Sequence, residues 1–335
     1  MTGMVANRPS ALGRALTLPV RALLSFVVGT LLCLTPVTSV LVLGWLTTVM
    51  RRRAFIVSGL AVPDNDQPRW MFGPRGQGWV VRSLGGLGTN IRSGFGAAFS
   101  LLLATFPFSV FWLVAWWAGW ENSFNKGYEQ AFVGPSVGLA GIAVFAAIMI
   151  YLPMGLAHQA VENRALSFFE HRQVRSAVRH AGWTHVGWAF TTLVLALPFF
   201  ASRGLPAFAE GIYPPIADMT AEKAVELRGA LDLAIAAYVF VTLLFLRSWL
   251  ARIYANAVLR ACRGKDADVW RMSPLVPRFG DVTVWRPAGA ARLVRLLALL
   301  ALWTALAVLV FVGQFLNHEW HVWLTHPYVF LPWIT

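Results

Sequence analysis

The sequence predicts an all-α fold, a polytopic integral membrane bundle, and three observations carry this prediction. Of the 335 residues, 57% are hydrophobic and only 13% are charged, whereas about a quarter of the residues in a soluble domain are charged. The mean hydropathy is high, at +0.60. The apolar residues gather into segments long enough to cross a bilayer, with arginines at their ends. These features exclude a soluble enzyme, a disordered chain and a secreted disulfide scaffold.

The chain opens with a basic N-terminal tail (1–21) and a long apolar segment (22–50) that contains Pro36. One straight helix over 22–50 would extend about 43 Å, against a hydrocarbon core of about 30 Å. Because proline removes a backbone donor and clashes with the preceding turn, we expect a helix break at Pro36. Both a re-entrant hairpin and a single kinked span fit this length. The re-entrant hairpin is favoured because it keeps the arginines of the tail on the arginine-rich side.

Five further segments meet the length of roughly 20 mostly apolar residues that a spanning helix needs. They are 95–117, 132–156, 183–200, 231–249 and 293–315. The two longest polar stretches, 51–94 and 247–292, are too short for independent domains. The whole chain (1–335) is therefore predicted to form one membrane-embedded domain.

The arginines predict how these spans are oriented. The loop 51–94 carries seven arginines, the stretch 247–292 carries nine Lys and Arg residues, and the tail 318–335 carries none. Short loops rich in Lys and Arg stay in the cytoplasm. We therefore expect a bacterial inner-membrane protein with cytoplasmic arginine-rich loops and an aromatic C-terminal tail on the periplasmic side.

The segment 162–181 is predicted to form an amphipathic helix in the headgroup layer. On a helix, its apolar residues can lie on one face and four arginines on another. The basic face can then contact anionic lipid headgroups or a partner protein. An ordinary interfacial anchor is the alternative interpretation. The predicted contact residues are Arg164, Arg172, Arg175 and Arg179.

The stretch 220–263 is predicted to form one continuous helix. It contains no proline and only one glycine, Gly229. Thr220 is a plausible N-cap, and Gly264 follows the last turn, where a left-handed cap residue would lie. At the standard rise this helix would be about 66 Å long, so it would protrude from both faces of the bilayer.

No motif in the chain supplies a chemistry, so we predict no catalytic, cofactor-binding or metal-binding residues. His318, His321 and His326 cluster after the last span, but no fourth ligand accompanies them. The middles of the five spans hold no charged residue, which disfavours an ion-coupled transporter. The arginines at the segment ends are explained by membrane orientation, so we expect no nucleic-acid partner.

Two parts of the chain carry a resemblance to a known family. The first is 43–53 (LGWLTTVMRRR) with 68–70 (PRW), and the second is 152–179, a proline-bearing span end followed by ENRALSFFEHRQVRSAVR. In this order of features the chain resembles a prokaryotic multi-pass membrane family filed as domain of unknown function 4013. The resemblance implies a helical membrane protein and brings no known activity or functional residues.

Two functions remain open at this point. The first is a non-enzymatic scaffold, assembly or regulatory component of a membrane complex, in contact with membrane lipids and membrane-protein partners. The second is a permease-like facilitator of a hydrophobic or neutral solute. A wide polar cavity between the proline-broken helices would favour transport, and a solidly packed bundle would favour the scaffold.

Overall fold

The computed structural model of the chain describes residues 11–63, 68–73, 78–124, 132–212, 214, 219–264, 266–276 and 289–317. These residues form α-helices and short 3₁₀ turns without a strand, which confirms the predicted all-α class. The elements, in chain order, are α1 (Ala11–Leu32), α2 (Pro36–Val57), α3 (Trp79–Phe124), α4 (Val133–Glu162), η3 (Ala165–Phe169), α5 (His171–Ala181), α6 (Trp183–Ile212), α7 (Ala221–Cys262), η5 (Ala267–Trp270) and α8 (Gly289–Asn317).

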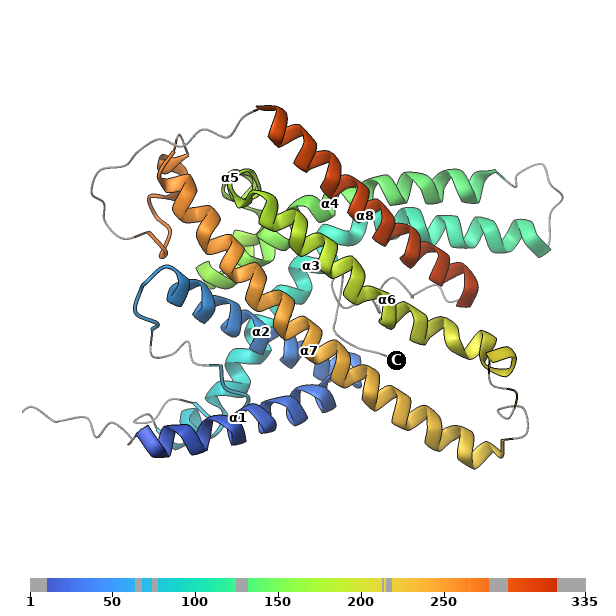
Figure 1. The fold of residues 1–335 in the computed structure, drawn as a ribbon, viewed down its shortest axis with the longest axis horizontal. Helices are drawn as coiled ribbons and strands as arrows, with labels where there is room; N and C mark the ends of the chain where they lie inside the picture. Colours follow the sequence, from blue (N-terminus) through green and yellow to red (C-terminus); the bar gives the residue numbers. More distant parts are fainter. Residues whose placement is uncertain are drawn as a thin grey trace, which may run out of the picture.

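Five helices are long and apolar enough to cross a membrane, namely α3, α4, α6, α7 and α8. They correspond to the five predicted spans. Figure 1 shows the C-terminal ends of α2, α4 and α7, the start of α3, and α5 together on the left. We call this side of the bundle the arginine-rich end, because the described arginines of the polar segments 51–94, 162–181 and 247–292 belong to it. The predicted tail 318–335 and its histidines His318, His321 and His326 lie outside the described residues.

The predicted break at Pro36 is confirmed. Helix α1 ends at Leu32, and α2 begins at Pro36, where the missing N–H is not needed by the helix. Thr35 caps the new helix, since its Oγ1 accepts a hydrogen bond from the Thr38 amide at 3.3 Å. Figure 1 shows α1 and α2 as the two arms of a V whose tip lies at this break, and whose open ends both lie on the left. The pair has the shape of the re-entrant alternative.

The predicted arginine-rich loop 51–94 is too long at both ends. Helix α2 continues to Val57 and α3 begins at Trp79, so residues of both loop ends are helical. Two glycines, Gly44 of α2 and Gly94 of α3, have a packing role here. A Cβ at Gly44 would overlap the Asn90 carbonyl, and a Cβ at Gly94 would overlap the Val40 carbonyl. The two glycines let α2 and α3 cross at backbone distance.

The predicted amphipathic helix 162–181 is interrupted. Helix α4 ends at Glu162, Asn163 adopts a left-handed conformation with φ of 55°, and the turn η3 precedes α5. Asparagine tolerates this conformation better than most residues, so it can end a helix in the way glycine does. The amphipathic helix is therefore α5 alone, and Arg164 lies before it, in the connection that leads into η3.

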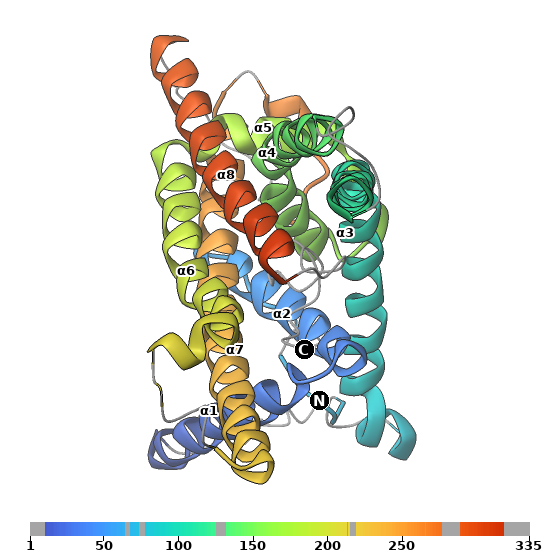
Figure 2. The same ribbon diagram turned by 90° about the vertical axis from the view of Figure 1, so that its right-hand side faces the viewer.

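The predicted long helix is confirmed almost to the residue. Helix α7 spans Ala221–Cys262, with Thr220 as N-cap accepting from the Lys223 amide at 3.4 Å. Its 42 residues span about 63 Å, and Figure 2 shows it running along much of the length of the bundle. The expected left-handed cap at Gly264 is wrong, because the positive-φ glycines of the described residues are Gly59 and Gly182.

Large buried aromatic side chains fill the middle of the bundle. Trp112 of α3 stacks on Phe145 of α4 with ring centroids 5.4 Å apart. Trp188 of α6 meets Trp303 of α8 edge-on at 6.1 Å. The V of α1 and α2 packs on α7, where Phe240 lies against Gly29, whose added Cβ would overlap its ring. These contacts are van der Waals contacts between closely packed helices, which is the kind of contact that holds helices together in lipid.

Candidate functional site

The structure separates the four predicted contact arginines. Arg164 is paired with carboxylates, its Nη2 lying 2.8 Å from Glu170 Oε1 and 3.8 Å from Glu162 Oε2. Arg179 Nη1 lies 3.3 Å from Asp266 Oδ2. The other two, on the exposed face of α5, make no ion pair with any described residue; they are Arg172 and Arg175. The predicted single basic face thus divides into two arginines that form ion pairs, Arg164 and Arg179, and two that are exposed without one among the described residues, Arg172 and Arg175.

A polar chain, buried at His158 and Tyr254, joins α4 and α7 to Glu170, the N-cap of α5, at the arginine-rich end. His158 of α4 contacts Tyr254 of α7 (Nδ1 to Oη, 2.6 Å) and Glu170 (Nε2 to Oε2, 2.7 Å). A carboxylate only accepts hydrogen bonds, so Nε2 of the neutral imidazole carries the proton and Nδ1 accepts from the phenol. Arg164 completes the chain on the second oxygen of Glu170. The order of the groups is Tyr254, His158, Glu170, Arg164.

A second polar group fastens the segment after α7. Ser176 Oγ donates to Asp266 Oδ2 at 2.8 Å and accepts from Trp270 Nε1 at 3.1 Å. The indole of Trp270 is fully enclosed and meets the His158 ring edge-on at 5.7 Å. The two polar groups therefore both contact the Trp270 side chain. Together they hold α5 against α7 and η5.

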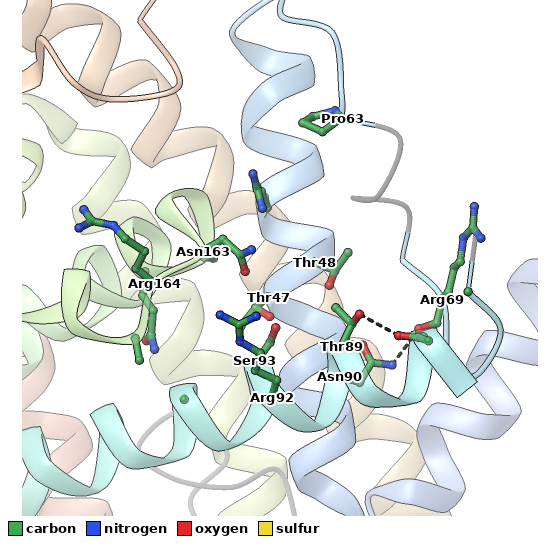
Figure 3. A pocket seen from close by; sticks show the side chains of 18 of the residues that line it. Thr47, Thr48, Pro63, Arg69, Thr89, Asn90, Arg92, Ser93, Asn163 and Arg164 are labelled. Atoms are coloured by element: carbon green, nitrogen blue, oxygen red, sulfur yellow. Dashed lines mark hydrogen bonds between the residues drawn. The ribbon is translucent and has the colours of Figure 1, made fainter. Parts of the chain in front are cut away.

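A cavity of about 790 Å³ lies at this same end, among α2, α3 and the chain that follows α4 (Figure 3). Its described lining contains four arginines and no Asp, Glu, His or Cys. We call it the arginine cavity. Its lining residues are Thr47, Thr48, Arg51, Pro63, Arg69, Gly73, Val81, Gly85, Gly86, Thr89, Asn90, Arg92, Ser93, Gly96, Gln159, Ala160, Asn163, Arg164, Ala165 and Leu166.

The walls of the arginine cavity are fixed by side-chain to backbone hydrogen bonds. Asn90 Nδ2 donates to the carbonyls of Arg69 and Trp70 at 2.8 and 3.1 Å, which ties the segment before α3 to that helix. Thr47 and Thr89 donate to carbonyls of their own helices, Gly44 and Gly85. Figure 3 shows Arg92 reaching from α3 toward Thr47, while Arg69 and Arg164 turn outward.

The arrangement can bind an anion, because cationic donors face a space without a carboxylate in its described lining. A nucleophile paired with a base is not found among those residues. The described part of the chain also holds no group of three or more His, Cys, Asp or Glu residues that could bind a metal ion. A second, shallower groove of about 630 Å³ lies between α2 and α7, beside Arg52, Arg53 and Trp249.

Sequence reasoning missed the polar chain and the arginine cavity. The sequence offered Glu162 and Glu170 as possible partners for arginine, but it gave no signal for the pairing of His158 with Tyr254 or of Ser176 with Asp266, which depends on how α4, α5 and α7 pack. The cavity combines residues from three separate parts of the chain, and only the folded bundle brings them together.

No family model, curated protein or solved structure matches this chain. The resemblance to the family filed as domain of unknown function 4013 stays a prediction. The class of the protein follows from the fold: five apolar helices long enough to span define a multi-pass helical membrane protein.

Proposed function

We propose that the protein is a non-enzymatic scaffold, assembly or regulatory component of a membrane complex. It would lie in a bacterial inner membrane, with the arginine-rich end in the cytoplasm and the C-terminus in the periplasm. Its partners would be other membrane proteins and the anionic headgroups of the cytoplasmic leaflet. The orientation rests on the excess of arginine at one end of the bundle.

The observation that carries this proposal is the rigid support under α5. The chain from Tyr254 to Arg164 fixes Glu170, the N-cap of α5, and the Ser176–Asp266 contact holds one face of α5 against the bundle. The opposite face presents Arg172 and Arg175 to the outside. A charged surface mounted on a fixed element is suited to docking, because little side-chain and backbone freedom is lost on binding.

The packing of the interior also supports a scaffold. Below the arginine cavity the bundle is filled by side chains with no measurable exposure, among them Leu101, Phe108 and Trp112 of α3 and Phe145 of α4. A solute path would have to displace these close-packed groups. The cavity lining offers no carboxylate or His base in its described residues, which supports the non-enzymatic part of the proposal.

Mild-detergent purification with quantitative identification of co-purifying proteins tests the proposal. Charge reversal on α5, Arg172→Glu with Arg175→Glu, should reduce the amount of the stoichiometric partner protein that co-purifies by several-fold. The matched control reverses two exposed charges near the other end of α7, Lys223→Glu with Arg228→Glu, and should keep the partner. Equal recovery in both variants, or no stoichiometric partner with the unaltered protein, would contradict docking through α5.

The second candidate is a permease-like facilitator of a hydrophobic or neutral solute. It is favoured by one observation, the position of the arginine cavity beside α2, α3 and α4, which contain Pro36, Pro107 and Pro153. The four arginines in its lining suit a charged molecule better than a neutral one. Liposomes containing the protein should therefore swell in glycerol at the rate of protein-free liposomes, and faster swelling would favour this candidate.

A further inference from the structure

We propose that the arginine cavity is a binding site for one anionic phospholipid, with the phosphate-bearing headgroup inside the cavity and the acyl chains along α3. This site is distinct from the α5 surface, because its cations lie on α2, α3, the segment before α3 and the connection after α4. Arg92 is the central residue of the site, and Arg51 lies in the same lining.

The charge of the cavity selects an anion. Arg92 is exposed to the cavity space and makes no ion pair with a described residue, and Figure 3 shows it directed toward Thr47 across the opening between α2 and α3. The guanidinium has a fork of donors that matches phosphate oxygens. Arg164 contributes less, because Glu170 already occupies it at 2.8 Å.

The position of the cavity along α3 selects a lipid over a soluble anion. Its lining on α3 extends to Gly96, which is where the predicted apolar span 95–117 begins. A phosphate there would lie at the level where headgroups meet hydrocarbon. Phe99 follows Arg92 by seven residues, two helical turns, and so lies close to the same face. The exposed apolar residues that continue this face are Phe95, Phe99, Leu102, Leu103 and Phe106.

The cavity also offers an acceptor for a headgroup hydroxyl. Gln159 is only 6% exposed, and its amide nitrogen donates to Ser100 Oγ at 3.2 Å. Its carbonyl oxygen, Oε1, is buried without a hydrogen-bond partner among the described residues. A buried acceptor without a donor is costly. A headgroup that carries both a phosphate and hydroxyl groups, such as the glycerol headgroup of phosphatidylglycerol, satisfies Arg92 and Gln159 together.

Native mass spectrometry of the detergent-purified full chain tests this site. The protein is titrated with phosphatidylglycerol or with phosphatidylcholine of the same acyl chains, and bound lipids are counted. We expect one saturable phosphatidylglycerol adduct and no comparable phosphatidylcholine adduct. Arg92→Gln should weaken the phosphatidylglycerol adduct at least about tenfold, the effect of losing charge-assisted hydrogen bonds.

The matched control is Arg82→Gln. Arg82 is an exposed arginine on the same helix and does not line the cavity. It lies about 15 Å from Arg92 along the helix, which exceeds the screening length of about 10 Å at 0.1 M salt. We expect less than about a twofold change. If both substitutions weaken the phosphatidylglycerol adduct equally, the lipid is bound by general charge attraction to the protein, which would overturn the proposed site.

Two competitors separate the lipid from other anions. Glycerophosphoglycerol, which has the headgroup without acyl chains, and inorganic phosphate should each displace the adduct only at a large excess over the lipid. Displacement by either at equal concentration would overturn the acyl-chain contact with α3. The result is independent of the α5 surface, whose test measures co-purifying proteins.

Discussion

The imidazole of His158 and the phenol of Tyr254 lie 2.6 Å apart (Nδ1 to Oη), although 96 residues separate them in the chain. Both side chains are almost completely buried, with exposed fractions of 1% and 0%. Their contact joins α4 to α7 at the arginine-rich end. The carboxylate of Glu170 on the other imidazole nitrogen sets the direction of this hydrogen bond.

Removal of the phenolic hydroxyl should therefore destabilise the bundle. In Tyr254→Phe the Nδ1 atom of His158 stays buried without a donor, at a cost of about 1–3 kcal/mol. The unfolding temperature in detergent should fall, as measured by intrinsic tryptophan fluorescence. The control is Tyr151→Phe on α4, which removes a hydroxyl from a side chain that is 41% exposed. An equal fall in both variants would show that the hydrogen bond to His158 contributes nothing.

Two glycine-to-alanine substitutions should change the stability of the protein in opposite directions. In Gly44→Ala the new methyl group overlaps the Asn90 carbonyl of α3, so α2 and α3 must separate. We expect destabilisation of about 1–3 kcal/mol. Gly88→Ala, in α3 itself, meets nothing within 4 Å. It should stabilise the helix by up to about 1 kcal/mol through its higher helix propensity. Thermal unfolding of the two variants side by side checks both signs, and a neutral Gly44→Ala would contradict the close crossing.

The continuity of α7 can be measured with two spin labels. Val225→Cys and Arg252→Cys place labels at exposed positions 27 residues apart, which corresponds to about 40 Å in a continuous helix. The background replaces the buried Cys33 and Cys262 by alanine. Double electron–electron resonance should give one distance near 40 Å. A distance below about 30 Å would mean a bend or break within α7.

The proposed orientation predicts which exposed positions react on each side of the membrane. With the same cysteine-free background, Val225→Cys should react with a membrane-impermeant maleimide in intact spheroplasts. Arg172→Cys should react only after the membrane is permeabilised. Both positions are exposed in the fold, so access to the reagent reports the side of the membrane. Reaction of Arg172→Cys in intact spheroplasts would reverse the orientation.

The features that local rules decide were predictable from the sequence. Proline at position 36 favours a helix boundary, and nothing between Thr220 and Arg263 stops a helix. The length and apolar character of the five spans followed in the same way. Each of these features depends only on residues that are neighbours in the chain, so it can be predicted from the sequence.

The features that depend on packing were not predictable. The packing role of Gly94 depends on Val40 in α2, and that of Gly44 depends on Asn90 in α3, so neither follows from neighbouring residues. Asn163 ended α4 by a left-handed turn that its neighbours did not require. Arg92 belonged to a predicted loop and became the central cation of a cavity only when the Gly44 crossing placed α3 beside α2.

The packing of the α1–α2 hairpin on α7 sets an order of events during synthesis. Gly29 lies under the ring of Phe240, so more than 200 residues must leave the ribosome before the hairpin can reach its final seat. At about 5–20 residues per second, that interval is roughly 10–40 s. Through this period the hairpin can pack on α3, which crosses α2 at Gly44 and Gly94, while its α7-facing side is covered by lipid, the insertion machinery or another protein. The side of the hairpin that meets α7 is thus completed only after α3 and α4 have been made.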